Sequence, residues 1–138
     1  MFKRSRSGSS RLRYTILLVE PNANMRSMLT SYLQKKFKVV CYGDGMTAIA
    51  GLRAGAPVDA MLVSDSLHQP STSEWTQAVK ASGLFGSIPV VCLSKQNQHA
   101  RKKLHKGADV FLTKPFNPEK LEGVINQLIR LQSVVSHG

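Results

Sequence analysis

The sequence predicts an α/β domain with a doubly wound, five-stranded parallel sheet and five helices. Two observations support this fold class. Five short apolar or β-rich runs alternate with segments of helical periodicity. The run at 15–19 is continuously apolar, which is typical of a strand covered on both faces. Because parallel strands need crossover connections, the helices are expected on both faces of the sheet.

The individual elements follow from apolar spacing and from turn signals. A helix is expected after a cap at Asn22 or Asn24, and Gly55 and Pro57 end the next one. Trp75 is expected to anchor a third helix by packing. The expected strands are 14–19, 37–42, 60–63, 88–93 and 110–113, and the later helices are 74–81, 98–106 and a last one from Asn117 onward.

Length and charge suggest one domain with a basic extension. The chain has 138 residues and a net charge of +11. Residues 1–13 are basic and poor in apolar side chains, so they are predicted to be a disordered tail before a domain at 14–134. No apolar run is long enough to cross a bilayer, which favours a cytoplasmic protein. Cys41 and Cys92 lie in expected strands, where lone cysteines are usually buried apolar residues.

Polar residues follow the expected strands at the positions where an α/β sheet usually carries its functional crevice. These residues are Glu20, Ser64, Ser94 and Lys114. In doubly wound folds the crevice lies at the carboxyl ends of the strands. These four residues are therefore the first candidates for a functional site.

The segment GADVFLTKPF at 107–116 resembles the closing segment of the response-regulator receiver domain of bacterial two-component systems. The runs ILLVE at 16–20 and IPVV at 88–91, followed by Ser94, resemble other receiver motifs in the same order. The resemblance covers about residues 14–133 and implies the flavodoxin-like receiver fold. It also implies phosphoryl transfer to an aspartate beside Mg²⁺, with Ser94 and Lys114 contacting the phosphoryl group and Phe111 as a switch aromatic.

The acidic pocket departs from the family pattern. Glu20 occupies the first acidic position, but Pro21 stands at the second and has no side-chain oxygen. The family's spacing from Asp59 leads to Ser64 as the acceptor position, so the acceptor is substituted. Asp65 would stand in for it if a β-bulge shifted the strand by one residue. Glu20 and Asp65 would then bind Mg²⁺; otherwise no cofactor is expected.

Three functional interpretations remain open at this point. The first is a degenerate pseudo-receiver, without enzyme activity, that works through protein–protein contacts in a phosphorelay. The second is a phosphorylatable receiver that uses Asp65 with Mg²⁺. The third is a basic adaptor that binds nucleic acid through residues 1–13 and a basic helix. The expected interaction face would suit an acidic protein surface, such as that of a histidine kinase or an output protein, and comprises Lys95, Arg101, Lys102, Lys103 and Lys106.

Overall fold

The computed structural model describes residues 13–95, 107–113 and 117–137, with side chains described as far as residue 132. Within these residues the elements alternate as predicted, and five strands form one parallel sheet in the order β2-β1-β3-β4-β5. The helix expected at 98–106 lies outside the described residues, which contain four helices. The elements are β1 Thr15–Val19, α1 Ala23–Leu33, β2 Lys38–Tyr42, α2 Gly45–Arg53, β3 Ala60–Ser64, α3 Thr72–Ala81, β4 Val90–Ser94, β5 Val110–Thr113 and α5 Pro118–His137.

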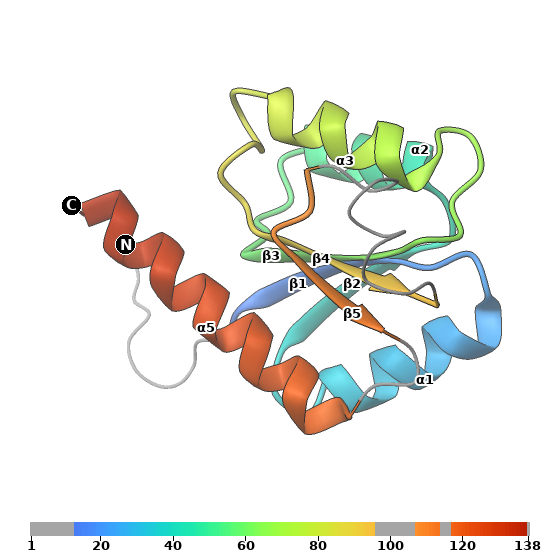
Figure 1. Ribbon diagram of the computed structural model, residues 1–138, viewed down its shortest axis with the longest axis horizontal. Coiled ribbons are helices and arrows are strands. Elements are labelled where there is room, and N and C mark those ends of the chain that lie inside the picture. The colour runs from blue at the N-terminus through green and yellow to red at the C-terminus, as the bar shows by residue number, and fades with distance from the viewer. Residues whose placement is uncertain (1–12, 96–106, 114–116, 138) are drawn as a thin grey trace.

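The sheet carries helices on both faces, which confirms the predicted architecture. Figure 1 shows α2 and α3 on one face, and α1 and α5 on the other. Alternate residues of each central strand therefore enter two separate cores. Leu62 of β3 packs with Leu33 and Ile125 on the α1/α5 side, whereas Val63 packs with Leu52 and Trp75 on the α2/α3 side.

Side-chain caps set where the helices begin. Asn22 Oδ1 accepts the Met25 amide at 2.9 Å and starts α1, so Asn22 is the cap of the two asparagines that the sequence offered. The third helix begins at Thr72, two residues before the expected Glu74. The reason is a capping box, in which Ser71 accepts the Glu74 amide and Glu74 accepts the Ser71 amide.

Two sequence expectations about strands need correction. Cys41 is exposed, not buried, because β2 is an edge strand that pairs only with β1. Cys92 is buried in β4, as predicted. The fourth strand begins at Val90 and not at residue 88, because Pro89 has no amide hydrogen to donate to the ladder.

Trp75 is the packing anchor that its sequence position predicted. Its side chain is fully buried, and Nε1 donates to the Gly45 carbonyl at 3.0 Å. Gly45 begins α2, so this bond ties the β2–α2 turn to α3. A Cβ at Gly45 would lie 2.6 Å from Trp75 Cδ1, which explains why this position lacks a side chain.

Gly45→Ala should therefore destabilise the domain by about 1–3 kcal/mol, because the buried indole must move. Urea denaturation followed by circular dichroism measures this change. The matched control is Gly123→Ala in α5, where a Cβ meets no atom within 4 Å. That control should stabilise the domain by about 0.5–1 kcal/mol through helix propensity alone. Equal effects of the two substitutions would contradict the role of the Trp75 contact.

Candidate functional site at the carboxyl edge of the sheet

The carboxyl ends of three neighbouring strands bring Glu20, Ser64 and Ser94 to one edge of the sheet. Strands β1, β3 and β4 are adjacent in the sheet order. Glu20 directly follows β1, and Ser64 and Ser94 end β3 and β4. All three side chains are buried. The fold thus gathers the first three sequence candidates, whereas Lys114 lies outside the described residues.

Glu20 is held by its own loop. Its side chain is 1% exposed, and Oε2 accepts the Asn22 amide at 3.0 Å. The guanidinium of Arg26 reaches back from α1 and donates to the Glu20 carbonyl at 2.7 Å. These contacts order the turn between β1 and α1. Arg26 was not predicted from the sequence, although an arginine one helical turn beyond the cap is a weak signal for such a contact.

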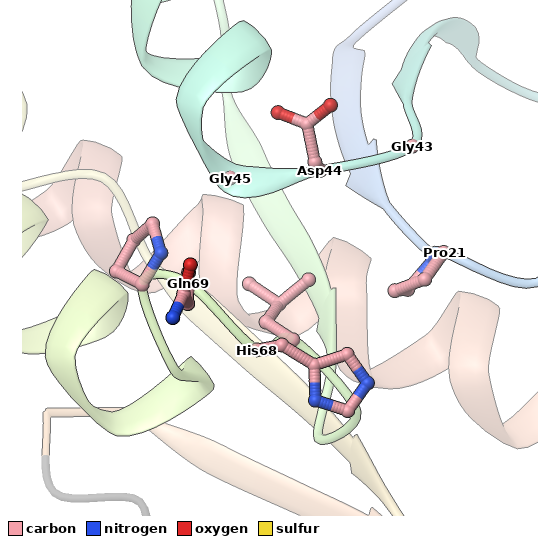
Figure 2. A pocket seen from close by; sticks show the side chains of 8 residues that line it. Pro21, Gly43, Asp44, Gly45, His68 and Gln69 are labelled. Atoms are coloured by element: carbon pink, nitrogen blue, oxygen red, sulfur yellow. The ribbon is translucent and has the colours of Figure 1, made fainter.

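Pro21 is exposed and forms part of the wall shared by two cavities. One cavity, of about 450 Å³, lies against the β2–α2 turn. In Figure 2 the turn at residues 43–45 is drawn above Pro21 and His68, and all of these residues line this cavity. The second cavity, of about 650 Å³, is also lined by Pro21 and His68, together with Glu20, Ser66 and Lys95. The Pro21 ring therefore lies on the rim of both cavities.

Ser64 ends β3 in an uninterrupted register. The pairs run from Met61 with Val90 to Ser64 with Leu93, so no extra residue bulges out of this ladder. The Ser64 hydroxyl shares a hydrogen bond of 2.7 Å with that of Ser66. The Ser64 carbonyl accepts a hydrogen bond of 2.7 Å from the buried Thr72 hydroxyl. The Ser64 side chain therefore lies at the end of β3 as part of the β3–α3 turn.

Asp65 reaches Ser94 without a bulge. Its backbone amide continues the ladder by donating to the Leu93 carbonyl at 2.9 Å. Its Oδ2 accepts hydrogen bonds from Ser94 Oγ at 2.9 Å and from the Lys95 amide at 3.1 Å. The carboxylate therefore binds the end of β4. From the sequence, Asp65 was expected to reach the site only if β3 carried a bulge. The hydrogen bond from the Lys95 amide to Asp65 was not predicted.

Among the described residues that directly follow β1, β3 and β4, the potential magnesium ligands are two carboxylates, those of Glu20 and Asp65. Mg²⁺ prefers octahedral oxygen ligands and is usually bound by carboxylates. The Pro21 side chain supplies none, and one oxygen of each carboxylate, Oε2 of Glu20 and Oδ2 of Asp65, accepts a backbone amide. The 650 Å³ cavity is lined by Glu20, Ser66 and Lys95, and Asp65 is not among its described lining residues. No group of three potential metal ligands occurs among the described residues.

Two other candidate sets are described only in part. Phe111 is partly buried and packs against the α2/α3 core, so its suggested role as a switch stays a prediction. Of the expected interaction face, Lys95 is described and exposed. Arg101, Lys102, Lys103 and Lys106 lie outside the described residues, as does most of the basic tail. The described helices include none that could span a membrane.

The fold and the strand-end residues define a doubly wound α/β domain whose crevice lies at the carboxyl edge of a 2-1-3-4-5 sheet. The profile of the response regulator receiver domain matches residues 16–126. The chain therefore belongs to the response-regulator receiver family, the receivers of two-component signalling.

Individual relatives agree with this assignment. The response regulator Rre1 of Synechocystis is 28% identical over 127 residues, which cover 88% of this chain and 54% of Rre1. The chain thus spans about half the length of that relative. The structure of the chemotaxis response regulator CheY4 of Vibrio cholerae matches with a TM-score of 0.77 and 25% identity, covering 85% of this chain and 99% of CheY4.

A further solved structure shows the same fold with a metal. The receiver domain of sensor histidine kinase PA1611 from Pseudomonas aeruginosa has magnesium coordinated in its active-site cleft. It matches with a TM-score of 0.78 and 22% identity, covering 86% of this chain and 98% of that one.

Thr72→Val should destabilise the domain by about 2 kcal/mol. The buried hydroxyl donates to the Ser64 carbonyl and accepts the Leu67 amide at 3.2 Å, and valine leaves both groups unpaired at nearly constant volume. Urea denaturation measures the change. Thr47→Val is the control: its hydroxyl also makes two hydrogen bonds, to the Asp44 carbonyl and carboxylate, but at an exposed position where water can replace them, so this variant should cost less than about 1 kcal/mol. A similar loss in both variants would contradict the proposed importance of the Thr72 hydroxyl.

Asp44 should make the stability of α2 sensitive to acid. The Thr47 amide donates to Asp44 Oδ1 and lowers the pKa of this carboxyl below its ordinary value of 3.8. Because the folded-state pKa lies below the unfolded one, the stabilisation is present above pH 3.8 and is lost as pH falls through the folded value. Asp44→Asn should remove this part of the acid dependence. The midpoint of urea denaturation, measured from above pH 3.8 downward, checks this prediction. Parallel plots of midpoint against pH for the wild type and Asp44→Asn would contradict it.

Proposed function

We propose that this domain is a pseudo-receiver, which signals through protein–protein contacts without accepting a phosphoryl group at the usual strand-end position. The observation that carries the proposal is the side chain at the end of β3. Ser64 stands there in an unbroken ladder with β4, and its hydroxyl is bonded to Ser66. A hydroxyl near neutral pH is a weak nucleophile unless a base is positioned beside it.

The surroundings of Ser64 support the same proposal. Phosphoryl transfer to a carboxylate needs a divalent cation to offset the accumulating negative charge. Pro21 offers no ligand for one, and the Asp65 carboxylate is bonded to the end of β4. In this proposal the domain has no enzyme activity of its own. Its partner is a protein with an acidic surface, of the kind found in a histidine kinase or an output protein.

A second candidate function rests on the contact between Asp65 and Ser94. In this alternative, Asp65 accepts the phosphoryl group and Ser94 contacts it. The 2.9 Å hydrogen bond from Ser94 Oγ to Asp65 Oδ2 favours this alternative, because it brings the aspartate that directly follows β3 beside the hydroxyl at the end of β4. Ser94 and the Lys95 amide bind Oδ2, so Oδ1 is the carboxylate oxygen that would attack a phosphoryl donor.

Incubation with acetyl phosphate and Mg²⁺, followed by intact-protein mass spectrometry, separates these functions. The wild type should gain no phosphoryl group. The double variant Pro21→Asp/Ser64→Asp restores the family pattern and serves as the positive control, which should gain one acid-stable, hydroxylamine-labile group. Such a gain in the wild type, lost in Asp65→Asn, would overturn the pseudo-receiver proposal in favour of the alternative.

Beryllofluoride, a mimic of the phosphorylated aspartate, provides a second readout that needs no covalent transfer. Amide spectra of the wild type should not change when Mg²⁺ and beryllofluoride are added together. The double variant should show shifts around residues 64, 94 and 111. Shifts in the wild type that disappear in Asp65→Asn would show that the crevice binds the mimic and would contradict the proposal.

A further inference from the structure

Strand β2 lies at one side of the sheet, where its backbone pairs with a neighbour on a single side. Among the described residues its strand partner is β1 alone. The Lys38 amide donates to the Tyr14 carbonyl at 2.9 Å, and the Tyr42 carbonyl accepts the Glu20 amide at 3.0 Å. Lys38 and Tyr42 are the two ends of β2. Because the bonding residues of a strand alternate along a ladder, every second residue of β2, starting at Lys38, turns its backbone groups toward β1.

The backbone groups of Val39 and Cys41 therefore point away from β1. Within the described part of the chain, no residue on that outer side forms a hydrogen bond with them. Cys41 is exposed, and Val39 is partly buried. An unpaired strand edge is a template on which another extended chain can add to the sheet through backbone hydrogen bonds. Such a partner must have a peptide backbone, which nucleic acids and lipid surfaces lack.

Four exposed cations surround the amino-terminal end of β2. Two of them lie in the turn that leads from α1 into the strand, one is the first residue of the strand, and one lies in the last turn of α2, which packs against β2. We name them the β2 cations; they are Lys35, Lys36, Lys38 and Arg53. They therefore approach the strand end from both faces of the sheet, since α1 and α2 cover opposite faces (Figure 1).

The charge of the β2 cations is not balanced by nearby acids. The one ion pair found among the described residues joins Lys80 and Asp109, so none of the β2 cations pairs with a described carboxylate. Lys35 lies over the Tyr32 ring, 5.8 Å from its centroid. Asp44 follows the other end of β2, and its carboxylate caps α2. The outer side of β2 thus combines unpaired backbone groups with an uncompensated positive charge.

Charge selects among the polypeptides that could pair with this strand. The chain has a net charge of +11, so a second copy would bring more positive charge to the β2 cations, and lysines on an edge strand oppose such pairing. The same cations attract a strand that carries carboxylates. We propose that the outer side of β2 binds an extended acidic segment of another protein, which adds a strand to the sheet. This surface is separate from the crevice, and the inference does not depend on the pseudo-receiver proposal.

Fluorescence anisotropy on the full chain, with a labelled octapeptide of alternating glutamate and valine, tests the charge selection. The wild type should bind this peptide and should not bind the matched peptide of alternating lysine and valine. Lys36→Gln/Lys38→Gln should weaken binding about fivefold, as expected for the loss of two exposed ion pairs. The control is Lys120→Gln/Arg130→Gln, which removes two exposed cations from α5, leaves the same net charge and should change the affinity less than about twofold.

Equal affinities of the two double variants would overturn the proposal, because net charge alone would then explain binding. Failure of the wild type to bind the acidic peptide would overturn it directly. Tighter binding of oligo(dT) than of the acidic peptide would overturn the choice of a polypeptide.

Amide hydrogen exchange, measured by NMR, tests whether the peptide pairs with the strand. With the peptide at about ten times its Kd, exchange of the Val39 and Cys41 amides should slow about tenfold, because a bonded amide exchanges only after the peptide leaves. The Val40 amide faces β1 and is the internal control. Unchanged exchange at Val39 and Cys41 would overturn strand addition. Exchange there that slows with rising protein concentration in the absence of peptide would identify a second copy as the occupant instead.

Discussion

The hydrogen-bonded register between β3 and β4 decides which side chain ends at the crevice. The ladder places Ser64 opposite Leu93, and the Asp65 amide extends it by one more bond to the Leu93 carbonyl. A slip of one residue would exchange Ser64 with Asp65 and move every side chain of β3 to the other face. Ala60 and Leu62 pack on one side and Met61 and Val63 on the other, so such a slip would disturb both cores.

The sequence was sufficient for the order of the described elements and for the positions of Glu20, Ser64 and Ser94 at the strand ends. Continuous apolar runs identified the buried strands, and Asn22 belongs to a residue type that commonly caps a helix. Exposure of Cys41 was not predictable in the same way, because it depends on β2 lying at the sheet edge. The contacts of Asp65 and Thr72 depend on the path of the turn after β3, which no residue spacing specifies.

The two edges of the sheet carry different chemistry. At the carboxyl edge, the polar groups of Glu20, Ser64 and Asp65 are largely engaged by neighbouring backbone and hydroxyl groups. At the amino edge, Lys36 and Lys38 remain exposed to solvent. In a parallel sheet these edges are separated by the full length of the strands. A change at one edge can therefore alter its binding chemistry while leaving the other intact.

Trp75 gives this domain an internal optical probe. It is the only tryptophan of the chain, it is fully buried, and its indole nitrogen donates to Gly45. Gly45 also lines the cavity shown in Figure 2, together with Asp44 and Gln69. Intrinsic emission therefore originates from one known position, next to the loops that surround the crevice. Any ligand or partner that moves the start of α2 would change the polarity around this indole and report its arrival without a label.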